Sequence, residues 1–85
     1  MVINFTRDFI KDSKRLTVGQ KEKLEQRLEL FGKDQFDPVL NNHSLTGKYL
    51  GYRSINVTGD LRAIFKKNNE EIIFVSIDSH SNLYG

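Results

Sequence analysis

The chain has 85 residues, of which 38% are hydrophobic and 28% are charged, so we expect one globular domain over residues 1–85. A domain this small has a thin core and no room for a large enclosed cofactor cavity, which places any chemistry in an open groove. Its longest apolar run, residues 72–75, is far shorter than the ~20 residues of a membrane span, and the N-terminus lacks the pattern of a signal peptide. We therefore expect a soluble, cytoplasmic protein.

The absence of cysteine excludes a disulfide scaffold, a cysteine-type zinc finger and a thiol nucleophile. The 13 Lys and Arg residues against 11 Asp and Glu give a formal net charge of only +2. These charges are unevenly spread, because residues 48–67 contain five basic side chains and a single acidic one. This segment is therefore a candidate contact for phosphate groups.

The first part of the chain predicts a short strand followed by two helices. Residues 2–5 alternate as in a strand, and Thr6 then provides the N-cap of a helix that ends near Arg15. A second helix begins with the capping box Thr17-Val18-Gly19-Gln20 and ends at Gly32. Its apolar side chains recur at i, i+4 and i+7: Leu24, Leu28 and Phe31. Because few residues separate the helices, they should form a hairpin with its apolar sides facing one sheet.

The second part of the chain predicts a sheet. Residues 33–48 have no sustained period and should form a long ordered loop. Three strands follow at residues 52–57, 61–66 and 72–77. Asn68-Asn69 tolerates the positive φ angles of a tight hairpin between the last two strands. The order β, α, α, β, β, β predicts an α+β fold in which a short N-terminal strand and a two-helix hairpin pack on an antiparallel sheet of about four strands.

Both histidines lie in irregular segments between small polar neighbours, as Asn42-His43-Ser44 and Ser79-His80-Ser81. An accessible imidazole titrates near neutrality, so each is a candidate general acid or base, although two histidines are also ordinary composition. Asp60 follows a glycine in a predicted turn, where aspartate commonly caps its own backbone. These three side chains have no helical i, i+4 pair, so we expect no metal site.

Basic and aromatic side chains alternate along the predicted strands. Arg62 and Lys66 share one face of their strand, and together with Arg53 they would form a sheet face that binds phosphates. Tyr52 and Tyr84 would add stacking for unpaired bases. A solvated sheet edge with aromatic packing at its rim gives the same pattern, so both interpretations remain open here.

Several common kinds of active site are missing from the sequence. There is no glycine-rich phosphate loop, no nucleophile elbow and no cysteine-histidine spacing, which removes the common nucleotide-binding and hydrolase classes. Metal-free RNA cleavage remains compatible, because the 2′-hydroxyl beside the scissile phosphate is itself the nucleophile. The protein then supplies only an acid, a base and cationic groups.

Three ordered blocks carry a resemblance to a known family: HSLTGKYLGYR at residues 43–53, GDLRAIF at 59–65 and SHSNLYG at 79–85. They resemble the RelE/ParE superfamily of toxins from bacterial type II toxin-antitoxin modules, and the YafQ branch most of all. The resemblance implies two helices packed on an antiparallel sheet. It also implies an mRNA interferase, an endoribonuclease that enters the ribosomal A site, cuts translated mRNA and is held inactive by a cognate antitoxin.

The resemblance also implies roles for individual residues. His80 matches the histidine near the C-terminus and would act as general acid or base beside the scissile phosphate. His43 and Asp60 would assist it in proton transfer or orientation. Tyr84 falls where the family has an aromatic residue that positions the substrate, and Arg62 matches a strand arginine that would stabilise the charged transition state.

The sequence departs from the YafQ-like pattern at three positions. Asn56 replaces a histidine, and an amide forms hydrogen bonds but moves no proton at neutral pH. Ser76 stands where that branch has an arginine, a loss that Arg62 would offset, and Leu61 replaces an aromatic residue. Beside the catalytic candidates, we expect five side chains to bind the substrate: Arg62, Tyr84, Asn56, Arg53 and Lys66.

Two other functions fit the same fold. A ParE-like toxin would act on DNA gyrase through protein contacts, and a degenerate relative would bind an antitoxin or nucleic acid without catalysis. The histidine-bearing loop and the Ser79-His80-Ser81 terminus favour the nuclease. Its expected partners are mRNA, the ribosome and an antitoxin whose partly disordered segment folds onto the toxin; we expect no membrane and no small-molecule cofactor.

Overall fold

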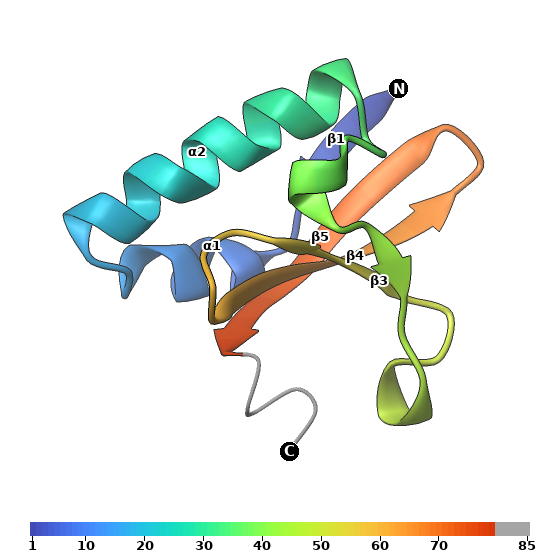
Figure 1. The fold of residues 1–85 in the computed structure, drawn as a ribbon. Coiled ribbons are helices and arrows are strands. Elements are labelled where there is room, and N and C mark those ends of the chain that lie inside the picture. Colours follow the sequence, from blue (N-terminus) through green and yellow to red (C-terminus); the bar gives the residue numbers. More distant parts are fainter. Residues whose placement is uncertain (80–85) are drawn as a thin grey trace.

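A computed structural model of the chain describes residues 1–79, and two helices pack there against one face of a five-stranded sheet (Figure 1). The elements in chain order are β1 (Val2–Phe5), α1 (Arg7–Lys14), α2 (Val18–Lys33), the 3-10 turn η1 (Pro38–Leu40), β2 (His43–Ser44), the 3-10 turn η2 (Gly47–Tyr49), β3 (Arg53–Asn56), β4 (Leu61–Asn68) and β5 (Glu71–Ser79). The predicted α+β class is confirmed. Neither helix of the described part is long and apolar enough to cross a membrane.

The strand order is β1-β5-β4-β3-β2, and the prediction of an antiparallel sheet of about four strands is wrong in two respects. The sheet has five strands, and β1 pairs with β5 in parallel while all other pairs are antiparallel. The chain leaves β1 through the helix hairpin and returns to that edge only with its last strand, which runs in the same direction as β1. The extra strand, β2, is a two-residue bridge inside the segment expected to be a loop.

Local signals at the helix ends behave as the sequence predicts. The Thr6 hydroxyl accepts a hydrogen bond from Phe9 N at 3.2 Å and caps α1. The capping box of α2 is complete, because Gln20 N donates to Thr17 Oγ1 at 3.2 Å and Thr17 N donates to Gln20 Oε1 at 2.9 Å. The hairpin between β4 and β5 places Asn69 at a φ of 57°, the left-handed region that asparagine tolerates.

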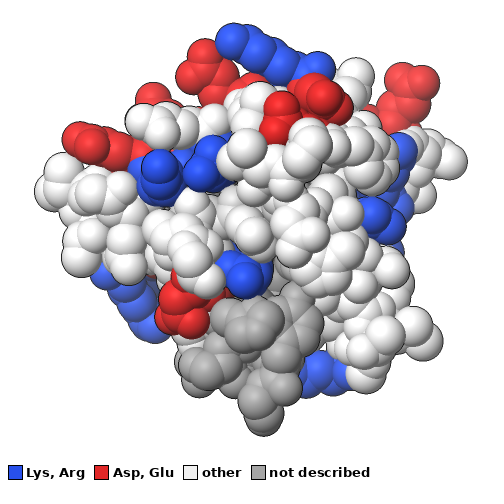
Figure 2. Space-filling view, in the orientation of Figure 1, with Lys and Arg blue, Asp and Glu red and all other residues white. Residues whose placement is uncertain are grey.

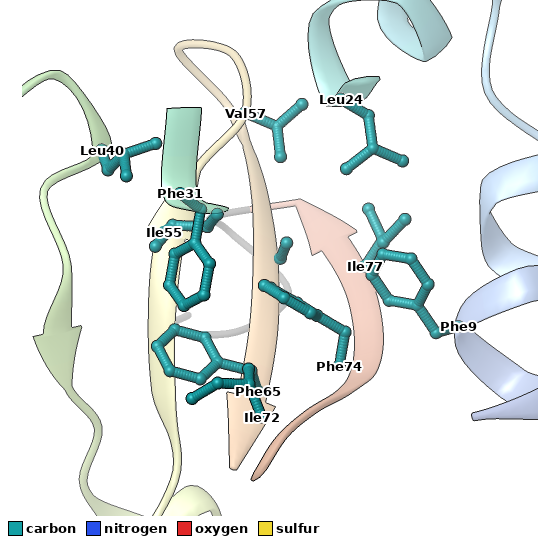
Figure 3. Close-up of a cluster of buried hydrophobic side chains, with 11 residues drawn as sticks. Phe9, Leu24, Phe31, Leu40, Ile55, Val57, Phe65, Ile72, Phe74 and Ile77 are labelled. Atoms are coloured by element: carbon teal, nitrogen blue, oxygen red, sulfur yellow. The ribbon is translucent and has the colours of Figure 1, made fainter. Parts of the chain in front are cut away.

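Aromatic rings form the centre of the core, between α2 and the sheet (Figure 3). Phe31 of α2 meets Phe65 of β4 and Phe74 of β5 edge-on, with ring centroids 5.1 and 5.4 Å apart. Phe9 of α1 joins them at 5.5 Å from Phe74, and all of these side chains are buried. Edge-to-face pairs add about 0.5–1.5 kcal/mol each to the burial of their area, so this cluster fixes both helices on one face.

Beyond the end of β1, side chains of Thr6 and α1 form hydrogen bonds with the backbone of β5. Pairing of β1 with β5 ends at Phe74, where Thr6 N donates to the Phe74 carbonyl at 3.0 Å. The Thr6 hydroxyl then donates to the Val75 carbonyl at 3.2 Å. Further along β5, Asp12 Oδ2 accepts from Ile77 N at 3.2 Å. The edge of β5 is thus satisfied by α1 where β1 is absent.

Candidate functional site

The face of the sheet opposite the aromatic core is lined largely by polar side chains, and we call it the polar face. Cross-strand partners lie on the same side of a sheet, so the register defines the set. Two rows cross it: His43, Ser54, Ile64 and Ser76 in one, and Asn56, Arg62 and Asp78 in the next. Three of the predicted site residues, from three strands, are therefore brought together in these two rows: His43, Asn56 and Arg62.

Hydrogen bonds from Nη1 fix the Arg62 side chain on this face, and they leave its Nε donor unused within residues 1–79. Its side chain is only 8% exposed, and Nη1 donates to the carbonyl oxygens of Thr58, Gly59 and Leu61 at 3.1, 3.3 and 3.2 Å. Its Nε is buried and has no hydrogen-bond partner within residues 1–79, and the same is true of Asn56 Oδ1 on the neighbouring strand. Buried polar atoms normally have a hydrogen-bond partner. Because the Arg62 Nε donor and the Asn56 Oδ1 acceptor lie in one cross-strand row, a polar ligand could supply both missing partners.

His43 is oriented by the loop that precedes it. Its Nδ1 lies 2.8 Å from the Asn41 carbonyl oxygen, and because a carbonyl only accepts, Nδ1 carries the proton of that bond. Asn41 adopts a left-handed φ of 46° at the end of η1, which turns its carbonyl toward the ring. Any proton that His43 exchanges is therefore the one on Nε2.

Asp60 lies exposed in the turn between β3 and β4, beside the row of Arg62. The expectation that Asp60 caps its own backbone is wrong, because Thr58 does so: its hydroxyl accepts from Asp60 N at 3.3 Å and from Leu61 N at 3.0 Å. The Asp60 carboxylate makes no hydrogen bond within the described residues and faces solvent.

Lys66 lies on the polar face, whereas Arg53 does not. The Lys66 Nζ is 5.8 Å from the centroid of the Tyr52 ring. Arg53 pairs with Phe65 and so projects on the core side of the sheet. There its Nε donates to Asn42 Oδ1 at 2.8 Å, and its guanidinium lies 5.7 Å from the Phe36 ring. The prediction that Arg53 joins Arg62 and Lys66 in one phosphate-binding face is therefore wrong.

Two predicted site residues, His80 and Tyr84, lie outside the described residues 1–79. Within that range, no three His, Asp or Glu side chains are grouped as a metal site would require. Figure 2 shows basic and acidic side chains interspersed on the side in view, with no single continuous basic area.

A groove of about 380 Å³ adjoins the polar face beside β5. Four charged or aromatic residues of its lining were not individual site candidates from the sequence: Asp8, Asp12, Lys48 and Tyr49. Of these, Lys48 had entered only as the first residue of the basic segment 48–67. The two acids come from α1, more than thirty residues before the other lining residues. Their i, i+4 spacing was the only available signal, and it is common on exposed helix faces.

Comparisons with known proteins agree with this fold. A family model described as a bacterial toxin of type II toxin-antitoxin system, YafQ, matches residues 1–85. YafQ from E. coli strain BL21(DE3) is 26% identical, with a TM-score of 0.76 over 98% of this chain and 97% of that chain. YafQ in the E. coli DinJ-YafQ toxin-antitoxin complex is 27% identical, with a TM-score of 0.73 over 98% and 96%.

A more distant structure shows the fold alone. The YoeB/ParE toxin from Agrobacterium tumefaciens is 18% identical, with a TM-score of 0.74 over 94% of this chain and 99% of that one. No curated protein matches the chain. The family model covers the whole chain, and the YafQ structures match its fold over 98% of its length. The chain belongs to the YafQ family of bacterial toxins of type II toxin-antitoxin systems.

Proposed function

We propose that this toxin is an endoribonuclease that cleaves translated mRNA at the ribosome. The observation that supports this best is the row of Asn56 and Arg62, next to the row of His43. Arg62 Nε and Asn56 Oδ1 are buried there and have no hydrogen-bond partner among residues 1–79. RNA offers the complementary groups: phosphate oxygens accept from a guanidinium, and a 2′-hydroxyl donates to an amide oxygen.

The proposed reaction requires no metal because its nucleophile belongs to the substrate. A base removes the 2′-hydroxyl proton, O2′ attacks phosphorus, and O5′ leaves with a proton from an acid. His43 is oriented to exchange a proton at Nε2, and we assign the opposite proton transfer to His80, with Asp60 as an orienting group. Arg62 would stabilise the added negative charge on the phosphorane-like transition state, while Asn56, Lys66 and Tyr84 bind the strand.

The proposed partners are an antitoxin, mRNA and the ribosome, which places the protein in the cytoplasm. The relative YafQ forms a complex with the antitoxin DinJ in E. coli, and we propose that this chain has a cognate antitoxin as well. Residues 48–67, with their five basic side chains, suit an acidic segment of such a partner.

Primer extension on cellular mRNA after induction of the toxin without its antitoxin tests the nuclease. We expect new 5′ ends within translated reading frames for the wild type and their loss in His80→Ala and His43→Gln, with far-ultraviolet circular dichroism unchanged. Lys67→Gln is a control, because this exposed residue pairs with Ile72 on β5 and lies off the polar face.

Intact mRNA during growth arrest by the wild type would contradict the nuclease. Induction of a DNA-damage response together with intact mRNA would indicate a gyrase-type toxin instead. Cleavage that persists in His80→Ala would remove this residue from the catalytic group.

A further inference from the structure

The groove beside β5 is lined by residues from a helix and a 3-10 turn as well as from the sheet, whereas the rows of the polar face come from strands alone. One wall comes from α1 and the other from η2, and strand residues lie between them. Its lining residues are Asp8, Asp12, Lys48, Tyr49, Tyr52, Val75 and Ser76. A volume of about 380 Å³ is within the range of small-ligand sites. The groove thus has an acidic wall that faces a basic and aromatic one.

Two tyrosines form a corner on the basic side. The Tyr49 and Tyr52 rings are edge-to-face, with centroids 6.0 Å apart and an interplanar angle of 81°. A lysine lies near each ring: Lys48 Nζ is 5.4 Å from the Tyr49 centroid, and Lys66 Nζ is 5.8 Å from that of Tyr52. A planar base that stacks on one ring meets the other ring with its edge, and the two lysines supply positive charge beside the rings for a phosphate.

The acidic wall holds two carboxylates: Asp12 forms hydrogen bonds to β5, and Asp8 forms none with residues 1–79. Asp12 Oδ2 accepts from Ile77 N at 3.2 Å and from the Ser76 hydroxyl at 3.5 Å, which fixes Asp12 to β5. Asp8 lies one helical turn earlier, is exposed and makes no hydrogen bond or salt bridge within residues 1–79. Two acids at i, i+4 repel each other, and Asp12 is already committed to the fold. Asp8 is therefore the carboxylate available to a ligand.

We propose that this groove binds one nucleotide of the RNA strand and that Asp8 selects guanine. The inference rests on the proposed function for the identity of the strand. Guanine has two adjacent donors, N1–H and the N2 amino group, that match the two oxygens of a carboxylate. Uracil presents carbonyl oxygens on both sides of its single donor, and a carboxylate repels them. Cytosine and adenine each place a ring acceptor beside the amino group, so they also lack the paired donors.

Binding of short RNA analogues tests the selection without any cleavage step. The probes are the 2′-O-methylated trinucleotides UGU and UUU, in which the nucleophilic hydroxyl is blocked, titrated against the full chain by NMR. We expect the wild type to bind UGU about tenfold more tightly than UUU, as a good bidentate base contact allows. Asp8→Asn should bring the two affinities within about twofold of each other, since its amide presents one donor and one acceptor. Glu22→Gln removes the same charge from an exposed site on α2 and should keep the tenfold ratio.

Equal affinity of the wild type for UGU and UUU would overturn the inference. A tenfold ratio that survives in Asp8→Asn, or binding of neither probe, would overturn it as well. Because no cleavage is measured, guanine selection in a protein that leaves mRNA intact would refute the nuclease and retain the nucleotide site. Cleaved mRNA together with equal binding of the two probes would refute guanine selection and retain the nuclease.

Discussion

At the scale of single residues, Arg62 combines a structural role in the turn with the functional role proposed for it. Its Nη1 closes the turn between β3 and β4 through three carbonyl oxygens, while its Nε remains without a partner among residues 1–79. The bonds to the turn hold the guanidinium in place before any substrate arrives. Such preorganisation is what electrostatic stabilisation of a charged transition state requires.

Replacement of Arg62 should therefore reduce stability as well as activity. We expect Arg62→Ala to lower the free energy of unfolding by about 1–3 kcal/mol, because partly buried carbonyls lose their charged donor. Lys66→Ala removes a positive charge from an exposed position of the same face and should change stability by less than about 0.5 kcal/mol. Urea denaturation of both variants measures the difference. A fully stable Arg62→Ala would show that the turn bonds contribute nothing to the fold.

The face of the sheet on which a side chain lies was predictable within the strands, because successive side chains of a strand alternate between its two faces. Residues 52–57 fall into two alternating sets, and the set of Asn56 does face the polar side together with Arg62. Arg53 belongs to the other set, with Ile55, so the alternation already contained the evidence that it lies on the core side. Asp8 could not be placed in this way, because its position beside the tyrosines depends on how α1 packs against β5.

At the scale of elements, the passage from β1 into α1 determines how the edge of β5 is completed. β1 covers this edge only from Glu71 to Phe74, and the two side chains Thr6 and Asp12 then take over. The same stretch contains the shift in register between β4 and β5 near Ile64. Asp12 accepts a hydrogen bond from Ile77 N just beyond this irregularity, next to Asp78, and so ties this part of β5 to α1.

Loss of this anchor should loosen the end of β5. We expect Asp12→Ala to cost about 1–3 kcal/mol, because Ile77 N loses a charged acceptor, and to speed hydrogen exchange of that amide. Asp8→Ala is the matched control on the same helix, and it should cost at most about 1 kcal/mol through the helix dipole. Unchanged exchange at Ile77 in Asp12→Ala would contradict the anchoring role.

The helix caps and the tight turn could be predicted from the sequence, whereas the pairing of strands far apart in the chain could not. Both N-caps and the left-handed Asn69 follow from short sequence signals, because the atoms involved lie within a few residues of each other. β2 has only two residues, too few to show alternation, and it exists because His43 and Ser44 pair with β3. The parallel pairing of β1 likewise depends on a contact between the first strand and the last.

At the scale of the whole molecule, the core and the site occupy opposite faces of one sheet. The aromatic cluster of Phe9, Phe31, Phe65 and Phe74 holds both helices on the first face, which leaves the second face to polar groups. With a net charge of only +2, the protein gains little from long-range attraction to RNA. We infer that placement of individual groups, together with a partner such as the ribosome, directs the toxin to its substrate.

The chemistry of the RNA ends tests the central proposal, attack by the 2′-hydroxyl, most directly. Translating ribosomes are incubated with the purified toxin, and the fragments are sequenced with and without prior polynucleotide kinase treatment. We expect one fragment of each cut to carry a 5′-hydroxyl end, which is ligated only after the kinase adds a phosphate, and the other to carry a 2′,3′-cyclic phosphate. Fragments with 5′-phosphate and 3′-hydroxyl ends would mean that water attacked the phosphorus, and they would contradict the mechanism assigned to this face.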